Sequence, residues 1–238
     1  MGLDIYVGSL SRYYARDWEL IAQKAARAAG YDFQVVYQNN PENISQEEAR
    51  PIIISWRDSI REGIKGSLKD NEKLEFNWDE TPESQYFTDK PDWDGYCSLL
   101  LWAAYSEHDD LVPPEKCVKD LNTDEALNRS TEATFKTTYP ALLRDVQLWI
   151  PEEFIFCFGT QDATGQETMI GSVMKLEQEL LELNDKTWKA DAQIITEWRD
   201  NGPSDTGNLE DAAKFGFSVF LDMANKAVEN NLVMKLDY

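Results

Sequence analysis

The spacing of apolar residues in the last third of the chain is the feature that most restricts its fold. Met169, Val173, Leu176, Leu180 and Leu183 follow one another at intervals of four, three, four and three residues. Because an α-helix has about 3.6 residues per turn, this spacing places all five side chains on one face. The pattern predicts an amphipathic helix that packs against a core, and it is too short to predict a coiled coil.

Other segments show helical or strand-like periodicity. The same apolar spacing predicts further helices over 18–29, 50–68, 91–107, 140–150, 188–198 and 208–227. Alternating apolar residues predict strands at 3–7 and 33–37, and a third strand is expected near 153–158. Ser45 and Glu48 have the spacing of a capping box, but Pro51 follows closely, so we expect that helix to begin near Arg50.

The distribution of these elements indicates the fold class. No linker rich in Gly, Ser or Pro divides the chain, and no repeat of 20–50 residues recurs. We therefore predict one globular α+β domain spanning residues 1–238. It should be rich in helices, with a small sheet made of the N-terminal strands and the strand near 153–158.

The charge of the chain excludes several classes of partner. The 238 residues include 44 acids and 23 bases, a formal net charge of −21, so clustered Lys and Arg for phosphate binding are absent and no nucleic-acid partner is expected. The longest apolar run, 99–104, is far shorter than the ~20 residues that span a bilayer, so no membrane association is expected. The N-terminus lacks the pattern of a secretory signal, and three cysteines without CxxC spacing suit a reducing compartment. These observations predict a cytoplasmic protein.

The segment 70–94 has the most unusual composition. It holds nine acids, two lysines, two prolines and two tryptophans, and its periodicity fails. Aromatic anchors among charged groups are typical of interface hot spots, and opposite charge accelerates association. We therefore expect a binding surface for a basic protein partner, although packing of this loop on the domain is the alternative. The candidate binding residues are Trp78, Asp79, Glu80, Glu83, Asp92, Trp93 and Asp94.

Catalytic motifs are sparse in this sequence. His108 is the single histidine, so any Ser-His-Asp triad would have to include it. Carboxylates with one imidazole suit Mg²⁺, Mn²⁺ or Ca²⁺, which makes Asp94, His108 and Asp110 candidate metal ligands, against the simpler interpretation of a solvated helix end. The glycines at 159 and 165 lack the lysine of a phosphate-binding loop. A binding role without cofactor or assigned catalytic residue is favoured, and a divalent-metal-dependent hydrolase or transferase is the alternative.

Three segments carry a resemblance to other proteins: MGLDIYVGSLSRYYARDW at 1–18, YPALLRDVQLWIP at 139–151 and IGSVMKLEQELLELNDKTW at 170–188. They resemble a family of uncharacterised bacterial proteins that share an MGLDIYVG N-terminus, a resemblance that implies no activity. A compact, very acidic, cysteine-poor chain is also similar in class to immunity proteins, which bind and block basic toxin domains. The expected function is thus an immunity-type inhibitor, and self-association through the amphipathic helices is a further expectation.

Overall fold

The computed structural model describes residues 2–31, 44–64, 74–118 and 120–238. Within them the strands form one mixed six-stranded sheet in the order β2-β1-β6-β3-β5-β4, and the fold is α+β as predicted. All strand pairs are antiparallel except β3 with β5. The strands are β1 (Asp4–Gly8), β2 (Phe87–Asp89), β3 (Leu148–Ile150), β4 (Phe158–Gln161), β5 (Glu167–Ser172) and β6 (Val233–Asp237).

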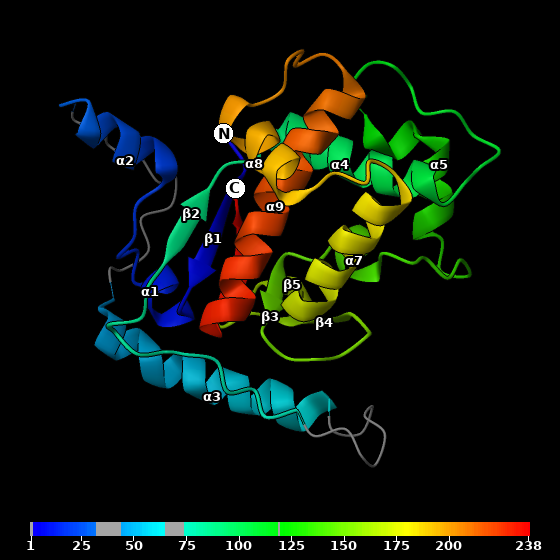
Figure 1. The fold of residues 1–238 in the computed structure, drawn as a ribbon. Helices are drawn as coiled ribbons and strands as arrows, with labels where there is room; N and C mark the ends of the chain where they lie inside the picture. Colours follow the sequence, from blue (N-terminus) through cyan, green and yellow to red (C-terminus); the bar gives the residue numbers. More distant parts are fainter. Residues whose placement is uncertain (1, 32–43, 65–73, 119) are drawn as a thin grey trace.

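Helices pack on both faces of the sheet (Figure 1). A first cluster of buried side chains joins one face to α4, α7 and α9, and a second cluster joins the other face to α1 and α3. The helices are α1 (Leu10–Tyr14), α2 (Ile21–Ala28), α3 (Gln46–Ile64), α4 (Asp92–Ser106), α5 (Glu125–Thr131), α6 (Pro140–Leu143), α7 (Val173–Lys186), α8 (Ala192–Asn201) and α9 (Leu209–Asn230), with a 3₁₀ turn at Leu121–Thr123.

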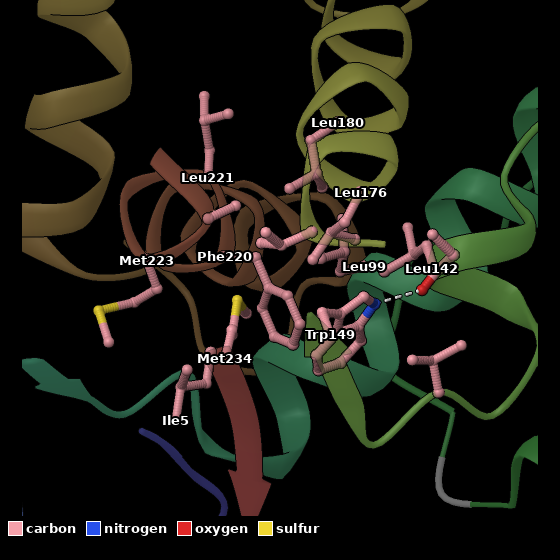
Figure 2. Close-up of a cluster of buried hydrophobic side chains, with 14 of the residues drawn as sticks. Ile5, Leu99, Leu142, Trp149, Leu176, Leu180, Phe220, Leu221, Met223 and Met234 are labelled. Atoms are coloured by element: carbon pink, nitrogen blue, oxygen red, sulfur yellow. Dashed lines mark hydrogen bonds between the residues drawn. The ribbon is translucent and has the colours of Figure 1, made fainter. Parts of the chain in front are cut away.

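Strand alternation explains how one sheet serves two cores. In β3, Trp149 belongs to the first cluster, whereas its neighbours Leu148 and Ile150 belong to the second. Figure 2 shows Trp149 beside Phe220, and the Trp149 indole N–H donates to the Ala141 carbonyl at 2.8 Å. A fully buried indole therefore keeps its polar atom satisfied.

The two longest helices of the first cluster touch through glycines. A Cβ placed on Gly216 of α9 would lie 2.2 Å from the carbonyl oxygen of Gly95 in α4. No other residue type fits this crossing, because any side chain would push the helices apart. Asn208 caps the start of α9 by accepting from the Asp211 amide, as the sequence predicted.

Several boundaries differ from those expected. The helix expected from Arg50 begins at Gln46, because the capping box forms: the Ser45 amide donates to Glu48 at 2.8 Å and the Glu48 amide to Ser45 at 3.2 Å. Pro51 lies in the second turn of this helix, where it has no N–H to donate to the Glu47 carbonyl. The expected strand at 33–37 lies outside the described residues.

Three further expectations about where helices and strands begin and end are corrected. The strand expected at 153–158 begins only at Phe158, where pairing with Ile170 starts, and Phe154 instead packs in the second cluster. The helix expected over 140–150 ends at Leu143, and β3 follows it. Met169 lies on β5 rather than on the helix, and the final strand β6 had no sequence prediction.

Candidate functional site

The structure separates the candidate binding residues into two groups at opposite ends of β1. Trp78 and Glu80 lie beside Leu10 and Ser11, which follow the last residue of β1. Strand β2 then runs antiparallel to β1, with Asp89 opposite Ile5, and delivers the chain to the start of α4. At about 3.4 Å per residue, β1 keeps the two groups more than ~10 Å apart. The seven residues therefore do not form one surface.

The first group is largely structural, which corrects the expectation for Trp78 and Glu80. Both residues are buried, with exposed fractions of 2% and 5%. The Glu80 carboxylate accepts from the amides of Leu10 and Ser11 at 2.9 and 2.8 Å, from the Ser11 hydroxyl at 2.5 Å and from the Trp78 indole at 2.6 Å. It thus ties the loop to the first turn of α1, and both side chains are taken up by contacts within the chain.

The other members of the first group have minor roles at the surface. The Asp79 carboxylate accepts from the Thr81 amide at 2.8 Å and shapes a turn. Glu83 is exposed. Trp78 is the aromatic member of this group and is buried, so the group presents no exposed aromatic anchor of its own.

The second group does form an exposed surface. Asp92, Trp93 and Asp94 occupy the first turn of α4, and Trp93 is 39% exposed. Its ring packs at 5.3 Å, edge to face, against the ring of Tyr238, which is 59% exposed. We call the Trp93 surface the set formed by Asp92, Trp93, Asp94, Asp145 and Tyr238.

The electrostatics of the Trp93 surface are negative. Asp145 is exposed and lies near Tyr238, where burial and then the Asp145 charge raise the pKa of the phenol. Burial raises the pKa of the neighbouring Asp4 to about 6, and the carboxylates of Asp237, Asp92 and Asp89 raise it against the opposing effect of Lys90. Lys90 pairs with Asp92 at 3.4 Å. Arg199 pairs with Asp89 at 2.6 Å. Lys90 and Arg199 are fewer than the carboxylates of Asp4, Asp89, Asp92 and Asp237, so this end of the sheet carries an excess of carboxylates.

The candidate metal ligands are not brought together. Asp94 lies in the first turn of α4, whereas His108 and Asp110 follow its last turn, so about 20 Å of helix separates them. His108 is buried, and its Nε2 lies 3.0 Å from the Ser130 hydroxyl. Asp110 pairs with Arg129 at 2.7 Å, which holds the pKa of Asp110 below its usual value. Within the described ranges, no three His, Cys, Asp or Glu side chains are arranged to hold a metal ion.

Sequence reasoning missed two members of the Trp93 surface. Asp145 and Tyr238 are distant from Trp93 in sequence, and their proximity depends on the β1–β6 pairing and on the turn before β3. An apolar run interrupted by Lys235 near the end of the chain could have indicated β6.

No helix in the described part of the chain has both the length and the apolar character needed to cross a bilayer. Comparisons with protein-family models, with curated proteins and with solved structures found no match.

Proposed function

We propose that this chain is an acidic protein-binding module that docks a basic partner protein on the Trp93 surface. The observation that carries the proposal is Trp93 itself, a partly exposed indole held against Tyr238 with carboxylates on both sides in sequence. Large aromatic side chains at an interface centre supply much of the binding free energy. The surrounding carboxylates would orient a cationic face and accelerate its association.

The finer form of the proposal is an immunity-type inhibitor of a basic toxin domain. It is supported by the net charge of −21, which favours a partner of opposite charge. An inhibitor of this kind needs a pre-formed surface and no catalytic group. The Trp93 surface has that character, because its anchor stands on the first turn of a helix whose apolar face is in the core.

The test is capture of a basic protein by the immobilised chain at low salt, followed by affinity measurements with charge-reversal variants. We expect the double change Trp93→Ala and Asp94→Lys to weaken binding by about thirtyfold or more, as the loss of a hot-spot aromatic does. Glu83→Lys is the matched control, because it makes the same charge reversal on an exposed acid of the other group. If no basic protein is captured, or if both variants bind equally well, the proposal is wrong.

A further inference from the structure

Strand β4 forms one edge of the sheet and carries no charge. In the described sheet, β5 pairs with β4 on one side, and the other side of β4 has no neighbouring strand. The run 154–161, which includes β4, holds no Asp, Glu, Lys or Arg, although 28% of the whole chain is charged. Edge strands commonly carry a lysine, a proline or an inward-pointing charge that prevents pairing with another chain. The four residues of β4 include none of these.

The pairing pattern determines which main-chain groups of β4 point outward. The Asp162 amide donates to the Gln166 carbonyl at 2.7 Å, so this pair is a hydrogen-bonded pair of the hairpin. Hydrogen-bonded and non-hydrogen-bonded pairs alternate along an antiparallel ladder. Thr160 is therefore bonded to β5, whereas the amides and carbonyls of Gly159 and Gln161 point away from β5.

Two further contacts agree with this orientation. Met169 is the cross-strand partner of Gly159, and its carbonyl accepts from the Gln147 amide at 3.1 Å on the opposite side of β5. The Gln161 carbonyl accepts from the Trp56 indole of α3 at 2.7 Å, outside the ladder. Within the described part of the chain, the amides of Gly159 and Gln161 and the Gly159 carbonyl have no hydrogen-bond partner.

Exposed apolar side chains accompany this open edge. Ile155, three residues before β4, is 74% exposed. A shallow groove on the surface of α3 is lined by Pro51, Ile52, Ser55, Trp56 and Ser59. Trp56 connects the groove to the edge through its bond to Gln161. Free main-chain donors and acceptors beside apolar side chains are the features by which a sheet edge binds an added β-strand.

The charge distribution favours a second copy of this chain as the source of that strand. A basic partner is attracted by carboxylates, and the uncharged edge offers none. The β4 edge of a second copy is equally uncharged, and two identical edges can pair antiparallel about a twofold axis. We propose that two copies of this chain join their β4 strands into one continuous sheet, in which Gly159 and Gln161 of each copy bond to the main chain of the other.

This inference does not rest on the proposed function. Strands β2 and β4 lie at opposite edges of the sheet, and Trp93 follows β2 by a few residues, so the two surfaces use different residues. The net charge of −21 on each copy opposes self-association, and salt screens that repulsion. Dimerisation should therefore strengthen as salt rises, whereas docking of a basic partner on the Trp93 surface should weaken.

Analytical ultracentrifugation of the full chain over a range of concentrations tests the pairing. We expect a monomer–dimer equilibrium whose dissociation constant falls by about tenfold or more between about 0.01 M and about 1 M salt, as the screening length shortens from ~30 to ~3 Å. Amide exchange measured by NMR gives a signature of edge pairing. Exchange at Gly159 and Gln161 should slow as the dimer forms, whereas the Thr160 amide, already bonded to β5, should change much less.

Two variants assign the dimer to the β4 edge. Gln161→Pro removes an outward N–H and keeps the bonds between β4 and β5, as a proline on the outer side of an edge strand does. Gly159→Glu places a carboxylate on the shared edge of both copies, and its Cβ would meet Met169 at an ordinary 3.8 Å. Each variant should raise the dissociation constant by about tenfold or more. Gln85→Glu, the same added charge on an exposed residue before β2, should leave it unchanged.

Circular dichroism of each variant establishes that it is folded, and if Gln161→Pro fails to fold, Gly159→Glu decides the question. The inference is overturned if the native chain keeps the monomer mass at every concentration and salt, or if a folded edge variant dimerises as tightly as the native chain. It is also overturned if exchange at Gly159 and Gln161 slows no more than at Thr160.

Discussion

Replacing Glu80 by glutamine tests whether the buried half of the acidic segment stabilises the fold. The glutamine has the same shape as glutamate but carries no charge. Its oxygen can still accept from the Leu10 amide and the Trp78 indole, which share one carboxylate oxygen in the native protein. Its NH₂ group would face the Ser11 amide, which donates to the other oxygen at 2.8 Å. One buried N–H is therefore left without an acceptor.

The expected loss of stability follows from these contacts. An unpaired buried donor costs about 1–3 kcal/mol, and each remaining bond weakens when its acceptor loses its charge. Relief from burying the carboxylate offsets part of this. We expect Glu80→Gln to lower the free energy of unfolding by roughly 3 kcal/mol, and the melting temperature by about 6–12 °C for a chain of this size.

Urea unfolding followed by tryptophan fluorescence measures this difference. Glu83→Gln is the control, because the same change on an exposed side chain should stay within about 0.5 kcal/mol of the native protein. A loss below about 1 kcal/mol for Glu80→Gln, or equal losses for both variants, would refute a structural role for this carboxylate.

Three further predictions concern the fold. Gly216→Ala should destabilise by about 2 kcal/mol or more in thermal melts, since its Cβ would meet the facing helix, whereas Gly63→Ala, with nothing within 4 Å, should stabilise slightly. Burial raises the pKa of Glu179 to about 8, so the native state binds this proton more tightly than the unfolded chain does. The contribution of protonated Glu179 to the free energy of unfolding is therefore fully present below about pH 4.5 and is lost as the pH rises through 8. The free energy of unfolding of Glu179→Gln, measured relative to that of the native protein, should rise by roughly 2 kcal/mol from about pH 5 to about pH 9. A difference between the two proteins that stays constant across that range would contradict this. Arg199→Ala should cost about 2 kcal/mol by urea unfolding, because it leaves the nearly buried Asp89 carboxylate without its partner at 2.6 Å; a loss below about 0.5 kcal/mol would contradict that.

Local patterns in the sequence predicted local structure well. The strand at Leu3–Val7, the helix at 91–107 and the Asn208 cap depend on neighbouring residues, and the structure confirms them. The boundaries near Met169 and Phe158 were wrong, because strand pairing between distant segments decides where those strands begin.

In the candidate site, too, contacts between distant segments decided what the local sequence could not. Composition alone marked Trp78 and Trp93 as equivalent, since both are tryptophans among acids. Their environments differ because Glu80 finds donors on α1, about 70 residues away in sequence, and draws Trp78 inward. Pairings over such distances are not encoded in the spacing of nearby residues, so the inward position of Trp78 could not be read from its surroundings.

Amide hydrogen exchange of the chain, alone and bound to its captured basic partner, tests the central claim most directly. Docking on the Trp93 surface predicts slower exchange at 92–96 and around Asp145 and Tyr238, with no change at 76–83. Protection confined to 76–83, or to a face remote from Trp93, would contradict the account.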